Sequence, residues 1–205
     1  MNIAVFASGR GSNFQAILDS IQLHVLSARV CVLISNNSTA GALDIARGNN
    51  VPAFHLSSRH FPYESEFVTH VLKVLDDHKA DFISLAGYMK KLPPEIIHRF
   101  RHRIANVHPA LLPAFGGVGM YGIKVHEAVI ASGCKVSGAT VHLVDEEYDR
   151  GPIVFQKTVP VKADDTPETL AARVLAVEHE IYPFTLDAFA KGKVRIEGQK
   201  AWIQS

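Results

Sequence analysis

The sequence predicts an α/β fold with a doubly wound, mostly parallel sheet and an antiparallel C-terminal part. Short apolar runs alternate with longer stretches in which apolar residues recur at helical spacing, as in residues 3–7 followed by 12–18. This alternation is typical of βαβ units, whose strands lie parallel. The later runs at 136–144 and 153–156 are separated only by a short polar turn, so we expect them to form an antiparallel pair.

The bulk composition is that of an ordinary globular protein. The 205 residues are 47% hydrophobic and 20% charged, so a single domain with a sizeable core is expected. The net charge of +1 gives no basic surplus for general nucleic-acid binding. The two cysteines, the absence of a long apolar span and an N-terminus that enters a strand at once argue against secretion and membrane insertion. We expect a cytoplasmic protein.

The first strand leads into a glycine-rich turn and then a helix. Ser12 and Gln15 have the spacing of a capping box, so the helix should start at Ser12, directly after Gly9-Arg10-Gly11. A strand, a glycine turn and a helix N-terminus together can bind a phosphate group. The turn lacks the third glycine of a dinucleotide site and the lysine of a P-loop, and a merely tight β–α turn is the alternative.

The remaining elements follow from apolar periodicity and from helix start and stop signals. Further strands are expected at 30–35, 51–54, 81–86 and 104–107, and a terminal hairpin at 193–196 and 201–203. Helices are expected at 40–47, 62–77, 93–100, 123–131 and from Thr166 to about Glu180. Four glycines between residues 116 and 122 indicate a mobile loop, for which a lid over a site is our hypothesis.

The segment Asn106-Val107-His108-Pro109, with Leu111-Leu112-Pro113 after it, stands where a buried strand ends. Ligands of open α/β sheets bind outside the carboxyl ends of the strands. An amide and an imidazole two positions apart at such an edge can both address one carbonyl oxygen, as an oxyanion stabiliser and a general acid. A capping Asn and a partly exposed His are the equally weighted alternative.

Three other polar groups have competing structural and functional interpretations. The acidic turn at 145–149 reads by composition as a solvated hairpin loop. Glu178 lies beside the apolar stripe of its helix, where a structural salt bridge is as well supported as a functional role. His98 and His102 have metal-ligand spacing, but the surrounding arginines favour a solvated basic face, and we expect no metal.

The central motif resembles the signature of the folate-dependent formyltransferases, and nearly the whole chain is similar to those members of the family that act on glycinamide ribonucleotide. The resemblance is carried by the Asn106–Pro113 motif and by Ser8-Gly9-Arg10-Gly11-Ser12-Asn13, Leu85-Ala86-Gly87-Tyr88-Met89, Asp149-Arg150-Gly151-Pro152 and Glu178-His179. The chain departs from the family at Ala110, where Ser is usual, and at Glu64, in a helical turn that often carries a folate-binding Arg. Arg59 is the candidate replacement for that Arg.

This resemblance implies a Rossmann-like formyltransferase fold and a role for each matched residue. The N-terminal half, about 1–100, would hold the nucleotide, and residues 101–205 would hold the folate. Asn106, His108 and Asp149 would be catalytic, with Asp149 raising the pKa of His108. The remaining implied contacts are Gly11, Ser12 and Asn13 to the substrate phosphate, Glu178 to the amine-bearing substrate, and Met89, Lys90, Lys91, Leu92, Asn106 and His142 to the folate.

The implied reaction is transfer of the formyl group of 10-formyltetrahydrofolate to the amine of glycinamide ribonucleotide in purine biosynthesis, by a monomer or homodimer. Methionyl-tRNA formyltransferase has related motifs, but it normally carries a further C-terminal domain and a basic surface for tRNA. Formyltetrahydrofolate hydrolase normally has an extra N-terminal domain, whereas the first strand here begins at Ile3. A non-catalytic folate or nucleotide sensor would have a broken constellation, yet Asn106, His108 and Asp149 are all present.

Overall fold

The computed structural model describes residues 1–204 and divides into two compact units, Met1–Ala105 and Asn106–Ser205. It is an α/β protein with parallel strands in its first unit and antiparallel strands towards the C-terminus, as the sequence predicts. The chain passes from one unit to the other within strand β5, Ile104–His108.

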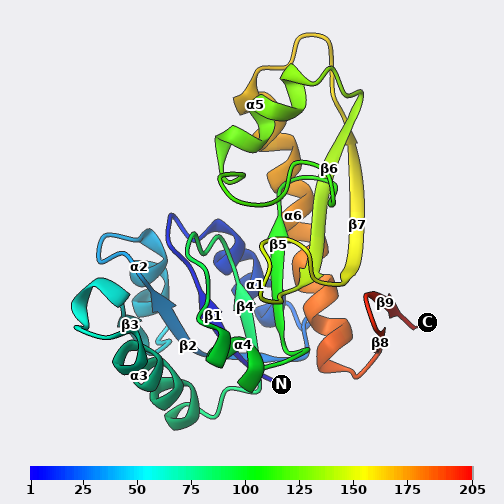
Figure 1. Cartoon of the computed structure of the whole chain (residues 1–205). Coiled ribbons are helices and arrows are strands. Elements are labelled where there is room, and N and C mark those ends of the chain that lie inside the picture. Colours follow the sequence, from blue (N-terminus) through cyan, green and yellow to red (C-terminus); the bar gives the residue numbers. More distant parts are fainter. Residues whose placement is uncertain (205) are drawn as a thin grey trace. The chain divides into compact units, whose positions relative to one another are not determined.

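The first unit is doubly wound. Its strands β1 (Asn2–Phe6), β2 (Arg29–Ser35), β3 (Ala53–His55) and β4 (Phe82–Leu85) lie parallel in the order β3-β2-β1-β4. Its helices, blue to green in Figure 1, are α1 (Ser12–Gln22), α2 (Gly41–Gly48), the 3-10 turn η1 (Ser58–His60), α3 (Glu64–Asp77) and α4 (Pro94–Arg99). Strand β1 is central and its residues Ile3 to Phe6 are fully buried, since helical connections cover both faces of such a sheet.

The start of α1 is as predicted, but the predicted capping box is wrong. The N-cap position is Gly11, in a left-handed conformation with φ 84°, and no side chain caps the helix. Gln15 instead donates from Nε2 to Asp19 Oδ1 at 2.7 Å. A Cβ at Gly11 would lie 2.9 Å from Ala42 Cα, so the approach of α2 requires glycine here. The first backbone N–H groups of α1 are therefore left without a side-chain cap.

The second unit is built on an antiparallel pair. Strand β6 (Val136–Leu143) pairs with β7 (Ile153–Pro160). Strand β7 then pairs in parallel with β9 (Lys200–Ile203), and β9 forms a hairpin with β8 (Val194–Glu197). The strand order in this unit is β5-β6-β7-β9-β8. The predicted terminal hairpin is confirmed. Helix α5 (Ile123–Ala131) packs on helix α6 (Pro167–Ala190), and α6 packs on β6 and β7.

The predicted end of the last helix at about Glu180 is wrong, because α6 continues through Pro183 to Ala190. A proline inside a helix removes one backbone hydrogen bond and crowds the preceding turn. Ile181, Tyr182 and Leu186 are each at most 1% exposed, so the burial of this stretch offsets that cost.

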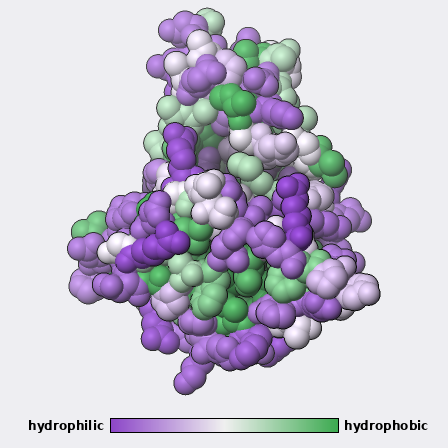
Figure 2. Space-filling view, turned by 90° about the vertical axis from the view of Figure 1, so that its left-hand side faces the viewer, coloured by the Kyte–Doolittle hydropathy of each residue, from purple (hydrophilic) through white to green (hydrophobic). Residues whose placement is uncertain are grey.

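One face of the molecule is mostly polar. On the face shown in Figure 2, hydrophilic residues predominate and hydrophobic ones appear in patches between them. None of the helices within residues 1–204 has the length and apolar character needed to cross a membrane.

Candidate active site

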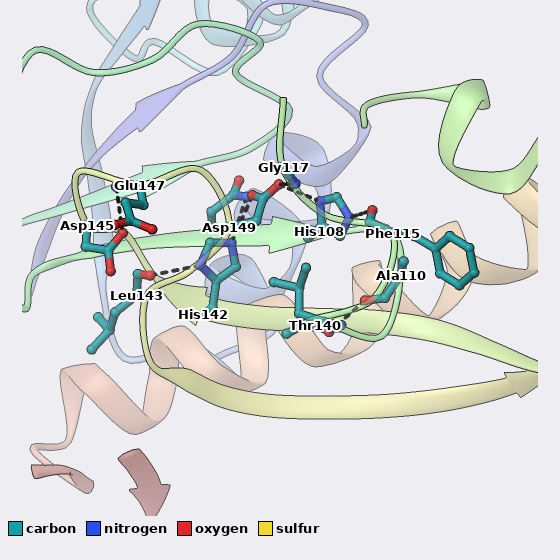
Figure 3. A network of polar contacts seen from close by, with 12 residues as sticks. His108, Ala110, Phe115, Gly117, Thr140, His142, Leu143, Asp145, Glu147 and Asp149 are labelled. Carbon is teal, nitrogen blue, oxygen red and sulfur yellow. Dashed lines mark hydrogen bonds and ion pairs between the residues drawn. The ribbon is translucent and has the colours of Figure 1, made fainter. Parts of the chain in front are cut away.

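The second unit brings together four polar side chains that the sequence singled out. Asn106 and His108 project from β5, His142 from β6, and Asp149 from the turn between β6 and β7. Figure 3 shows Asp149 lying between the rings of His108 and His142. Its Oδ2 lies 3.7 Å from His108 Nδ1, and its Oδ1 lies 3.5 Å from His142 Nε2. The acidic turn is therefore more than a solvated loop, since it places one carboxylate between two buried imidazoles.

The polar contacts of His142 place a proton on Nδ1 and bring the ring against Asn106. Nδ1 of His142 lies 2.8 Å from the Leu143 carbonyl, and a carbonyl only accepts, so Nδ1 carries a proton. Nε2 of the same ring lies 3.1 Å from Asn106 Nδ2 and 3.5 Å from Asp149 Oδ1, so it faces both the amide and the carboxylate. An amide nitrogen has two N–H groups, so Asn106 keeps a second donor for a ligand.

The Asp149 carboxylate is also held by the glycine-rich loop. The backbone N–H of Gly117 donates to Asp149 Oδ2 at 2.8 Å, and Asp149 itself adopts a left-handed φ of 55°. Burial alone would raise the pKa of Asp149. The contacts with His142, with the Gly117 N–H and with His108 outweigh it and lower the pKa below its ordinary value. Asp149 is therefore a carboxylate at neutral pH.

His108 differs from the expectation that Asp149 would raise its pKa. Burial lowers the pKa of His108, which is 3% exposed, and this outweighs the raising effects of Asp149 and of the Phe115 carbonyl. Its Nε2 lies 2.8 Å from that carbonyl and so carries the proton of the neutral ring. The neutral ring thus turns its unprotonated Nδ1 towards Asp149. The sequence shows that the Asp149 carboxylate is present, but it does not show how deeply His108 is buried.

The turn after His108 is anchored by two residues that the sequence analysis assigned no role. Thr140 Oγ1 donates to the Ala110 carbonyl at 2.6 Å and accepts from the Leu112 N–H at 3.0 Å. Gln156 Nε2 donates to the Leu112 carbonyl and to Thr140 Oγ1, each at 2.9 Å. The sequence offers one indication of a role for Thr140. Side chains alternate between the two faces of a strand, so Thr140 lies on the same face as His142. The hydrogen bond at position 110 uses the backbone carbonyl and not the side chain, so an alanine there can make it.

Gly116 lies at the point where the loop meets the Asp149 turn. A Cβ there would be 2.5 Å from Leu112 Cδ2 and 3.1 Å from Asp149 Cβ. We expect Gly116→Ala to displace Asp149 and to lower turnover by about tenfold, or about 1.4 kcal/mol of barrier, with little change in melting temperature. Steady-state kinetics and thermal melts check this. Gly48→Ala, whose Cβ meets nothing within 4 Å, is the control. Unchanged turnover in Gly116→Ala would show that the turn tolerates the shift.

A further buried imidazole, His126 on α5, predicts how stability depends on pH. It is 4% exposed, and burial together with the nearby charge of His108 lowers its pKa. A histidine with a depressed folded pKa binds its proton more readily when unfolded, so stability falls as pH drops below about 6.5. We therefore expect His126→Phe to gain more stability relative to wild type at pH 5.5 than at pH 7.5. Urea unfolding at both pH values measures this, and equal differences would contradict it.

The other predicted residues lie on other elements of the chain. Gly11, Ser12 and Asn13 form the uncapped start of α1 in the first unit, where Asn13 is buried. Residues 89–92 follow β4 in the same unit, and the Met89 N–H donates to Ser8 Oγ at 2.8 Å. Met89 is exposed and Leu92 is buried. Glu178 is buried in the middle of α6. Within residues 1–204, no group of three His, Cys, Asp or Glu side chains is placed to hold a metal ion.

Comparison with known proteins identifies the family of this site. A family model described as formyl transferase matches residues 1–186. The phosphoribosylglycinamide formyltransferase of Escherichia coli is 33% identical over 99% of this chain and 93% of that protein. The chloroplastic phosphoribosylglycinamide formyltransferase of Vigna unguiculata is 44% identical over 94% of this chain, which spans only 62% of that protein's length. The crystal structure of glycinamide ribonucleotide transformylase 1 from Symbiobacterium toebii is 38% identical, with a TM-score of 0.94 over 100% of this chain and 94% of that one. The chain belongs to the formyl transferase family.

Proposed function

We propose that this protein transfers the formyl group of 10-formyltetrahydrofolate to the primary amine of glycinamide ribonucleotide. One observation carries the proposal: a carboxylate, Asp149, is held between His108 and His142, with the amide of Asn106 beside them. The similarity to enzymes named for this substrate supports the choice of acceptor. The formyl transferase family uses formyltetrahydrofolate as its co-substrate, which supports the choice of donor.

The start of α1 suits the phosphate of such a substrate. Gly11 turns the chain, and the backbone N–H groups that begin the helix have no side-chain cap. The helix dipole and the backbone N–H groups of this first turn favour a bound anion. We assign Gly11, Ser12 and Asn13 to the phosphate, Glu178 to the amine-bearing part of the nucleotide, and residues 89–92 with Asn106 and His142 to the folate. In this proposal residues 1–100 chiefly serve the nucleotide and residues 101–205 the folate, with Glu178 and residues 89–92 as the exceptions.

Attack of the amine on the formyl carbon makes a tetrahedral intermediate with a negatively charged oxygen. Asn106 would donate its second N–H to that oxygen, because its first is engaged by His142. His108 would donate from Nε2, which in the resting structure is bonded to the Phe115 carbonyl. The Phe115 carbonyl therefore lies where the oxyanion would accept this hydrogen bond. The loop has to move the carbonyl away from Nε2 before the oxyanion can bind there. When His108 takes up a proton at Nδ1, the resulting imidazolium would be stabilised by the Asp149 carboxylate beside that atom.

Asp149 would also receive the proton lost by the attacking amine, directly or through a water molecule. Its lowered pKa keeps it ionised and able to accept. Collapse of the intermediate then breaks the bond from carbon to the folate nitrogen, and that nitrogen leaves with the proton that Asp149 took from the amine. The amine is itself the nucleophile, so these steps need no covalent intermediate with the protein.

The experiment that tests this function measures release of deformylated folate by the purified protein, with and without glycinamide ribonucleotide. Release that depends on the nucleotide, with formylated nucleotide as product, is the expected result. Release without the nucleotide would assign a hydrolase instead. Binding of the folate with no release in either case would favour a sensor or a different acceptor amine.

The glycine-rich loop should become protected when both substrates bind. Gly117, Gly119 and Gly122 all have positive φ, and Val118 is 86% exposed. We expect limited proteolysis between Phe115 and Gly122 to slow in the presence of the nucleotide and a non-reactive folate, because the loop would close over them. Cleavage at an unchanged rate would contradict a lid.

A further inference from the structure

An open hollow lies in the second unit, lined in part by Arg150 and Gly151 of the turn that carries Asp149. It has a volume of about 470 Å³ and is lined by residues that include Pro113, Arg150, Ile153, Lys200 and Trp202. Strand β9 pairs with β7 at Ile153 and Lys200, which holds the C-terminal hairpin beside the turn. Figure 1 shows this hairpin next to the start of β7.

The hollow carries positive charge that the protein does not neutralise. Arg150 and Lys200 are exposed, and neither makes an ion pair or a side-chain hydrogen bond with another described residue. No acidic residue is among those lining the hollow. Glu197, which faces Lys200 across the hairpin, pairs with Arg195 instead. Two unpaired cations in one hollow favour a ligand with two negative charges, and phosphate monoesters have this charge near neutral pH.

Trp202 adds a flat apolar surface to the same hollow. Trp202, on strand β9, is 45% exposed. Indole faces stack on planar rings, with each stacked base contributing about 1–3 kcal/mol in nucleic-acid complexes. A phosphate with no ring, or a flexible chain of carboxylates, would leave this surface unused.

We propose that this hollow binds a nucleoside monophosphate, with its base against Trp202 and its phosphate between Arg150 and Lys200. Asp149 is not among the residues that line the hollow, and its carboxylate faces His108 and His142. Arg150 and Gly151 directly follow Asp149 in the chain, so a ligand held there contacts the turn that carries the carboxylate. This inference does not depend on the proposed formyl transfer.

Tryptophan fluorescence tests the site directly, because Trp202 is the single tryptophan of the chain. The full chain is titrated with adenosine 5′-monophosphate, guanosine 5′-monophosphate, inorganic phosphate, adenosine and triglutamate. Saturable quenching by a nucleoside monophosphate is expected, with a dissociation constant at least about tenfold lower than those of phosphate or adenosine alone. Lys200→Gln should raise that constant by about tenfold. Lys193→Gln, at the exposed base of the hairpin, should leave it unchanged.

Each other outcome overturns the proposal. No saturable change with any monophosphate would exclude the site. Equal affinity in wild type and Lys200→Gln would place the bound nucleotide elsewhere. Tighter binding of triglutamate than of the nucleotides would reassign the hollow to a polycarboxylate. Melting temperatures of the two lysine variants, measured without ligand, separate a lost contact from a misfolded hairpin.

Discussion

Asp149→Asn is expected to lower the rate of formyl transfer by about 10²- to 10⁴-fold while leaving the fold intact. The amide has nearly the same shape and can still accept from the Gly117 N–H, so the turn should hold its conformation. It cannot accept the proton of the attacking amine, and it carries no charge to stabilise a protonated His108. Single-turnover formyl transfer at saturating substrates measures the loss.

Glu147→Gln is the matched control for this experiment. Glu147 is exposed, lies in the same acidic turn and is likewise changed from a carboxylate to an amide. We expect it to retain wild-type turnover. Similar losses in the two variants would assign the effect to the charge of the turn as a whole. A rate close to wild type in Asp149→Asn would remove Asp149 from the mechanism.

A loss of comparable size is expected for His108→Asn. Asparagine reaches only as far as the Nδ1 position, so the donor at Nε2 is lost, and removal of one such donor typically costs about 10²- to 10³-fold. His108→Gln restores an N–H at about the Nε2 position but cannot become charged. We expect it to recover part of the rate if the hydrogen bond alone is needed, and none if an imidazolium forms.

The pH profile separates these roles further. Because burial lowers the pKa of His108, the ring is neutral in the resting protein at pH 7. The rate in wild type should therefore not require a resting imidazolium, and it should stay level as pH rises from 7 to 8. A rate that falls steadily over this interval would show that His108 has to be charged before the substrates bind.

Much of the fold was predictable because it depends on local patterns. Apolar runs bounded by glycine and proline located β1, β4 and β5, and the helical spacing of Phe67, Val71 and Leu75 located α3. The errors were at element ends. Gly11 rather than Ser12 occupies the N-cap of α1, because α2 packs against that turn. Helix α6 passes Pro183, because buried neighbours stabilise the helix beyond it.

The candidate site divides in the same way between sequence and structure. The sequence by itself determined which groups are available: an amide and an imidazole two positions apart on one strand, and a carboxylate before Arg150-Gly151-Pro152. Only the tertiary structure decided that Asp149 lies between two imidazoles and that Phe115 and Gly117 bond to His108 and Asp149. It also decided that burial outweighs the carboxylate in setting the pKa of His108. The physical reason is that burial and hydrogen bonding depend on segments brought together by folding, whereas residue type and spacing are properties of the chain.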